Sequence, residues 1–145
     1  MIKFIAGGKG EGKTKLLIDI ANAAAKTTEG HLVFIDDDSR HIYDLHYDIR
    51  FIDTSGFPLS NYREFIGFLC GILSQDNDIV EIFVDGICNI VKNIDNDELV
   101  ELINKLQALS VEHELDFTIS MNNKYDNLPE AIKPLVINRE ATADV

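Results

Sequence analysis

Short apolar runs alternate with amphipathic segments along most of the chain. Runs of this kind that are rich in β-branched and aromatic side chains are typical of strands. They occupy residues 2–6, 31–35, 49–52, 79–84 and 117–121. Near the end of the chain, a short helix is expected around residues 129–132, followed by a last strand at residues 135–137.

The segments between these runs carry apolar residues at helical spacing. Ser60 or Asn61 can cap one helix, and Glu64 stands at the capping-box position relative to Asn61. Asp95 and Glu98 form a second capping-box pattern before another leucine-rich helix.

This alternation over 145 residues predicts a single α/β domain spanning residues 1–145. We expect a three-layer α/β/α arrangement with a mostly parallel central sheet, because the runs at 31–35 and 79–84 are apolar almost throughout, as in strands buried on both faces. Ligands bind such sheets at the carboxyl ends of the strands. The polar segments expected at that edge are residues 7–12, 36–38, 53, 85 and 120–123.

The segment after the first strand contains four of the nine glycines within six positions. It matches G-x-x-x-x-G-K-[ST] at Gly7, Gly12, Lys13 and Thr14. Glycines let backbone N–H groups approach an anion, and residues 14–26, rich in Leu, Ile and Ala, predict a helix whose positive end favours the same anion. The pattern predicts a phosphate-binding loop; the alternative is a flexible glycine turn before a Lys-Thr pair.

The expected cofactors are therefore ATP and Mg²⁺. Lys13 is expected to reach the β and γ phosphates as a catalytic cation, and the Thr14 hydroxyl to hold Mg²⁺. The residues expected to contact the nucleotide in this loop are Gly7, Gly8, Lys9, Gly10, Glu11, Gly12, Lys13, Thr14 and Lys15.

A second site element is the apolar run at residues 82–85, which ends in Asp85. Mg²⁺ dehydrates reluctantly and is held through few direct carboxylates. Beside a phosphate-binding loop, we expect Asp85 to be the acid on the metal side. Many buried strands also end in an aspartate that has no such role.

In order and spacing these motifs resemble the core of RecA-type ATPases, a branch of the P-loop NTPases, over most of residues 1–138. The resemblance implies a catalytic carboxylate just beyond the second strand, where Asp38 lies, with Asp36 or Asp37 as alternatives. It also implies that Asn122, after the fifth strand, senses the γ-phosphate.

Two positions qualify this resemblance. Gly86 stands where many hydrolysing members carry a glutamate that orients the attacking water. RecA-like oligomers often place an arginine in a neighbour's site, and Arg139 is the candidate, although a lone arginine near a chain end is typical of a surface residue. More loosely, the whole chain resembles small P-loop proteins of Gram-positive bacteria that are sometimes described as twitching-motility ATPases.

The distribution of charge along the chain limits the kinds of partner that it is expected to bind. Residues 1–30 carry five lysines against three acids, which leaves −14 for the other 115 residues, since the chain as a whole carries −12. A positive island around the glycine-rich loop suits a polyphosphate, whereas the acidic remainder would repel DNA or RNA. We expect a nucleoside triphosphate and no nucleic acid as partner; a protein partner or self-association stays open.

Localisation is expected to be cytoplasmic. No apolar run approaches the length of a membrane span, and the first residues form a strand and not a signal peptide. Cys70 and Cys88 are isolated in apolar stretches, which predicts reduced core residues. The four histidines show no metal-ligand spacing.

Three functions fit these observations. The first is a slow, Mg²⁺-dependent ATPase that acts as a nucleotide-dependent switch or small motor subunit. The second is an interaction module that binds ATP with negligible hydrolysis. The third is a small-molecule kinase, which the absence of an arginine-rich lid after residue 85 disfavours.

Overall fold

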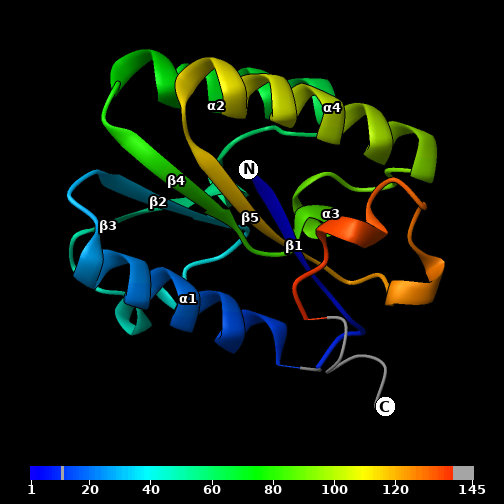
Figure 1. Cartoon of the computed structure of the whole chain (residues 1–145), viewed down its shortest axis with the longest axis horizontal. Coiled ribbons are helices and arrows are strands. Elements are labelled where there is room, and N and C mark those ends of the chain that lie inside the picture. The colour runs from blue at the N-terminus through cyan, green and yellow to red at the C-terminus, as the bar shows by residue number, and fades with distance from the viewer. Residues whose placement is uncertain (11, 139–145) are drawn as a thin grey trace.

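A computed structural model of the protein describes residues 1–10 and 12–138. Its centre is one five-stranded sheet in which every pair of neighbouring strands is parallel (Figure 1). The sheet order is β1-β5-β4-β2-β3, so β5 lies between β1 and β4. The strands are β1 (Ile2–Ala6), β2 (His31–Asp36), β3 (Ile49–Asp53), β4 (Ile79–Val84) and β5 (Asp116–Met121).

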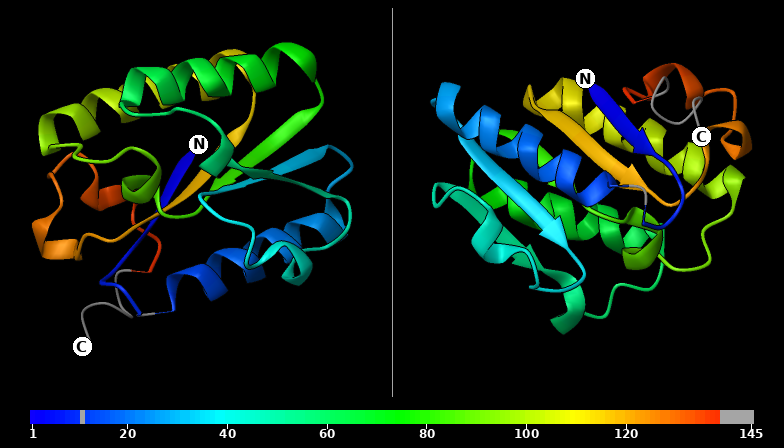
Figure 2. Two further views of the ribbon diagram at one scale, coloured as in Figure 1. Left: turned by 180° about the vertical axis from the view of Figure 1, so that it is seen from behind. Right: turned by 90° about the horizontal axis from the view of Figure 1, so that it is seen from below.

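Helices cover both faces of this sheet and give three layers. α1 (Lys13–Thr27) lies on one face, and α2 (Tyr62–Gln75) and α4 (Asn96–His113) lie side by side on the other (Figures 1 and 2). The expected α/β fold with a parallel sheet is confirmed. The shorter elements are α3 (Ile87–Ile90), η1 (Ile42–Asp44), η2 (Thr54–Gly56), η3 (Tyr125–Asn127) and η4 (Lys133–Leu135).

The central strands are buried on both faces, as their sequences predict. Phe34 and Phe83 point toward α1, where they pack with Leu17. Alternate residues of the same strands, such as Val33 and Ile82, belong to the core beneath α2 and α4. Burial on both sides explains why these strands are apolar at successive positions and not only at every second one.

Both predicted helix starts are confirmed. The Asn61 side chain accepts a hydrogen bond from the Glu64 N–H at the start of α2, and the Glu64 carboxylate accepts from Ser60. Asp95 and Glu98 form a reciprocal capping box at the start of α4. These local bonds satisfy N–H groups that a helix end otherwise leaves without partners.

The last strand expected at residues 135–137 and the short helix around residues 129–132 are wrong. Residues 129–132 form a turn, and the chain then enters η4. Val136 makes only an isolated bridge with Phe4, and Pro134, which has no N–H, lies inside η4. The Asn138 side chain bonds both the N–H and the C=O of Ala6, so a side chain replaces the backbone pairing there.

The two cysteines differ in burial. Cys70 is exposed on α2, so the prediction that it lies in the core is wrong, whereas Cys88 is half-buried.

In the ranges 1–10 and 12–138, no helix combines the length and the apolar character needed to cross a membrane.

Candidate functional site

The glycine-rich loop leaves β1 at the carboxyl edge of the sheet and enters α1. Gly10 and Gly12 have φ values of +84° and +81°, in the left-handed region that glycine adopts without strain. Gly12 is the N-cap residue of α1, and no side chain among the described residues caps it. The positive end of α1 therefore faces the cavity that this loop borders.

Lys13 is buried and folds back over this loop. Its ammonium group donates a 2.7 Å hydrogen bond to the Gly8 carbonyl. The neighbouring Lys9 is exposed and also lines the cavity. Two cations thus border the same space from the loop side, which favours an anion there.

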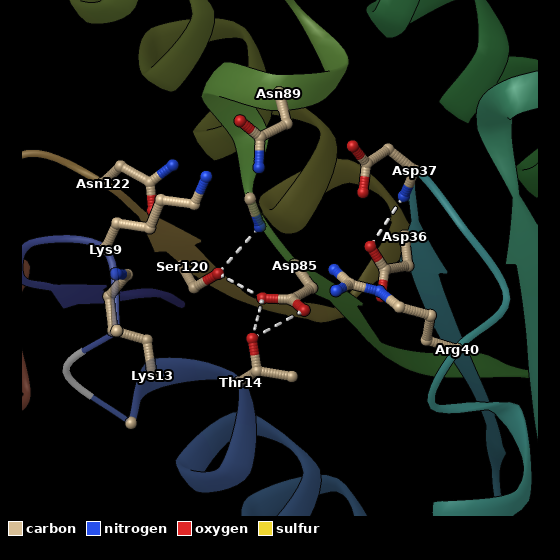
Figure 3. Close-up of a pocket in the computed structure, with 13 residues that line it drawn as sticks. Lys9, Lys13, Thr14, Asp36, Asp37, Arg40, Asp85, Asn89, Ser120 and Asn122 are labelled. Atoms are coloured by element: carbon tan, nitrogen blue, oxygen red, sulfur yellow. Dashed lines mark hydrogen bonds between the residues drawn. The ribbon is translucent and has the colours of Figure 1, made fainter.

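Asp85 connects the loop side of the site to the sheet. The Thr14 hydroxyl donates to its carboxylate, with Oγ1 3.0 Å from Oδ2, and the Ser120 hydroxyl donates to Oδ1 at 2.7 Å. Ser120 in turn accepts from the Gly86 N–H (Figure 3). These bonds link the start of α1 to the end of β4 and to β5, the strand that separates β1 from β4.

Gly86 is required by the local backbone. Its φ is +70°, and a Cβ at this position would lie 2.8 Å from Nδ2 of Asn89. A side chain at residue 86 would therefore carry backbone strain and press on α3. A glutamate directly after Asp85 would have to adopt this positive φ, which favours glycine.

Two carboxylates at the end of β2 face the same cavity. Asp36 is buried, and burial raises its pKa to about 8, with further contributions from its hydrogen bonding with Asp37 and from the negative charge of Asp85. Asp37 is half-buried, and its N–H donates to the Asp36 carboxylate at 2.7 Å. At this edge of the site the buried Asp36 carboxyl group therefore favours its protonated form.

The third aspartate of this segment, Asp38, is bonded to Arg40. Both oxygens of Asp38 accept from Arg40, one from the backbone N–H and one from Nε, each at 3.0 Å. These bonds hold the pKa of Asp38 below its usual value. Asp38 is not among the residues that line the cavity, whereas Arg40 is.

The cavity enclosed by these elements has a volume of about 270 Å³. Asn89 from α3 and Asn122 after β5 close it on the remaining side (Figure 3). Its lining consists of Lys9, Gly10, Gly12, Lys13, Thr14, Asp36, Asp37, Arg40, Asp85, Gly86, Asn89, Ser120 and Asn122.

The structure therefore brings together most of the residues predicted from the sequence. Others lie outside the lining. The Gly7 N–H bonds the Asn123 carbonyl, Gly8 accepts from Lys13, and Asp53 accepts from the Ser55 N–H. Lys15 is exposed on α1 and pairs with Asp19. Glu11 and Arg139 lie outside the described residues.

Sequence reasoning missed Arg40 and Asn89. Arg40 carries a weak signal, since it follows directly on the aspartate triplet at a strand end. Asn89 carries none, because α3 is only four residues long and shows no helical periodicity.

The donor set fits Mg²⁺. The ion prefers oxygen ligands and few direct carboxylates, and here a hydroxyl and a carboxylate, Thr14 and Asp85, lie within hydrogen-bonding distance at the cavity. No protein-family model matches the chain, and no curated protein sequence matches it.

The raised pKa of Asp36 predicts that the stability of the protein in EDTA depends on pH. The folded-state pKa of about 8 exceeds the ordinary value of 3.8, so folding favours the protonated form, and stability is lost as the pH rises between these two values. Asp36→Asn mimics the protonated form. We therefore compare the unfolding free energy of this variant with that of the wild type at two pH values. The advantage of the variant should be larger at pH 8 than at pH 5 by at least about 1 kcal/mol, a lower limit that allows for solvent screening.

Urea denaturation at the two pH values measures this difference. Glu112→Gln, at an exposed position on α4, is the control and should show no such growth. A gain for Asp36→Asn that is equal at both pH values would contradict the assignment.

Proposed function

We propose that this chain is a P-loop protein with a RecA-like core that binds ATP together with Mg²⁺ and hydrolyses it slowly. The observation that carries the proposal is the meeting, at one cavity, of the glycine-rich loop, buried Lys13 and the Thr14–Asp85 hydrogen bond. The sequence motif alone predicts a loop. Its position opposite a carboxylate from a different strand is what supports a metal-bound triphosphate.

The size and polarity of the cavity support the phosphate end of a nucleotide as its occupant. Its volume of about 270 Å³ lies just below the roughly 300–1,000 Å³ of pockets that enclose drug-sized ligands. Its lining contains no apolar side chain among the described residues. Phosphates suit this cavity, and the base and ribose would lie outside it.

The residues divide into three roles in this proposal. Lys13 and the amino end of α1 stabilise negative charge on the phosphates. Thr14 and Asp85 would hold Mg²⁺, which supplies further charge stabilisation when bound. Asn122, at the end of β5, lines the cavity and can donate a hydrogen bond to a phosphate oxygen.

Asp37 is the carboxylate that we assign to orienting water. Of the three aspartates left open by the sequence, Asp38 is held by Arg40, and Asp36, with a pKa of about 8, is mostly protonated at neutral pH. Asp37 lines the phosphate cavity and also an adjoining cavity of about 260 Å³, so water can reach it from outside. A single, half-buried aspartate in this role is consistent with slow turnover.

A second candidate function is an interaction module that binds ATP without turnover. The segment between β2 and β3 that carries Asp37 into the cavity also exposes Ile42, Tyr43 and Tyr47. Tyr43 is 95% exposed, and large aromatic side chains on a surface favour protein contacts. A change at the phosphates would thereby reach a surface that a partner can contact.

Lys13→Ala should lower the affinity for Mg²⁺-ATP at least about tenfold, because the buried ammonium group that borders the phosphates would be gone. Titration of a fluorescent ATP analogue measures the affinity. Lys15→Ala is the matched control: it removes a lysine two residues away that is exposed and paired with Asp19, and it should bind within about threefold of the wild type. Equal affinities of the wild type and Lys13→Ala would overturn the proposed binding site.

Asp37→Asn should leave Mg²⁺-ATP affinity within a few-fold while it lowers the rate of phosphate release by about 10²-fold, the usual scale for a positioned base. Asp38→Asn should lower the rate much less. Phosphate release under saturating ATP distinguishes the two variants. Loss of rate in Asp38→Asn but not in Asp37→Asn would reverse the assignment, and tight ATP binding without release in the wild type would favour the interaction module.

A further inference from the structure

Arg40 occupies an unusual position at the phosphate cavity. It lies on the segment between β2 and β3, away from the glycine-rich loop in sequence. Its side chain is 78% exposed, yet it lines the cavity. Figure 3 shows its guanidinium group across the cavity from Lys9 and Lys13, with Thr14 and Asp85 between the two sides. A cation therefore stands at the rim opposite the loop.

Asp38 holds this arginine in place. One carboxylate oxygen accepts from the Arg40 backbone N–H, and the other accepts from Nε, both at 3.0 Å. The turn and the side-chain direction are thus fixed by the same group. Because Nε is the bonded atom, the two terminal nitrogens of the guanidinium group still have donors to offer.

The charges around the cavity show what a ligand would change. Three acidic residues, Asp36, Asp37 and Asp85, line it, and Arg40 is attracted to Asp37 as well as to Asp38. With a cation held at Thr14 and Asp85, the negative charge at this rim would be partly neutralised. A terminal phosphate lying between the loop and the rim would then be the strongest acceptor near the guanidinium group, whose planar fork suits phosphate oxygens.

We infer that Arg40 recognises the terminal phosphate of the nucleoside triphosphate and that Asp38 is a positioning residue that orients its guanidinium group. This inference rests on the proposed function. Arg40 would then let the protein distinguish ATP from ADP. It lies on the same segment that exposes Tyr43 and Tyr47. It also accounts for Asp38 outside the cavity lining without a role as a base.

The test compares the affinities for Mg²⁺-ATP and Mg²⁺-ADP by isothermal titration calorimetry. Arg40→Ala should weaken ATP binding roughly 10- to 100-fold, the scale for hydrogen bonds to charged groups, and should change ADP binding by less than about threefold. Arg40→Lys should keep part of the preference for ATP, because it retains the charge and loses the fork. Arg63→Ala, at an exposed position on α2, is the control and should keep the wild-type ratio.

A double-mutant cycle tests the positioning role. Asp38→Asn should reduce the ratio of ATP to ADP affinity severalfold in the wild-type background and leave it unchanged when Arg40 is already alanine. Thermal melts of all variants report whether each is folded. Equal effects of Asp38→Asn in both backgrounds would contradict the positioning role.

The outcomes separate the two proposals. A wild type that binds neither nucleotide would overturn the proposed function, and this inference with it. A wild type that binds both equally, or a preference for ATP that Arg40→Ala retains, would overturn the role of Arg40 and leave nucleotide binding intact.

Discussion

The arrangement of the site depends on the hydrogen bonds made by the Asp85 carboxylate. β1 and β4 are not neighbours in the sheet, because β5 lies between them. The Thr14 and Ser120 hydroxyls both donate to Asp85, and Ser120 also accepts from the Gly86 N–H. These bonds fix the start of α1, the end of β5 and the turn after β4 relative to one another.

Acidic and basic side chains gather around the same position. Asp85 and Asp36 are both buried at the carboxyl edge of the sheet, and the pKa of Asp36 is raised to about 8 by burial and by nearby acidic groups. Lys13 is engaged with the loop carbonyl of Gly8, and Arg40 is held by Asp38 at the rim. The raised pKa of Asp36 beside these two cations marks this edge of the sheet as a candidate ligand site.

The sequence predicts the fold well because the fold rests on local patterns. Five strands, three long helices and two capping motifs follow from periodicity and cap residues within a few positions. The failures have tertiary causes. Val136 and Asn138 are placed by their contacts with β1, and Asn89 enters the cavity because Gly86 turns the chain with a positive φ. Which aspartate of the triplet faces the cavity depends on the turn that Asp38 forms with Arg40, and residue type alone does not distinguish them.

The proposed ligand, a metal-bound triphosphate, would occupy the cavity between the glycine-rich loop and Asp85. The most direct measurement is calorimetric titration of ATP into the wild type and Asp85→Asn over a series of Mg²⁺ concentrations. Wild-type affinity should rise steeply with Mg²⁺, and Asp85→Asn should flatten that dependence, because the carboxylate that would hold the ion becomes a neutral amide. ATP affinity in the wild type that is the same with Mg²⁺ and with EDTA, or an unaltered Mg²⁺ dependence in Asp85→Asn, would contradict the account.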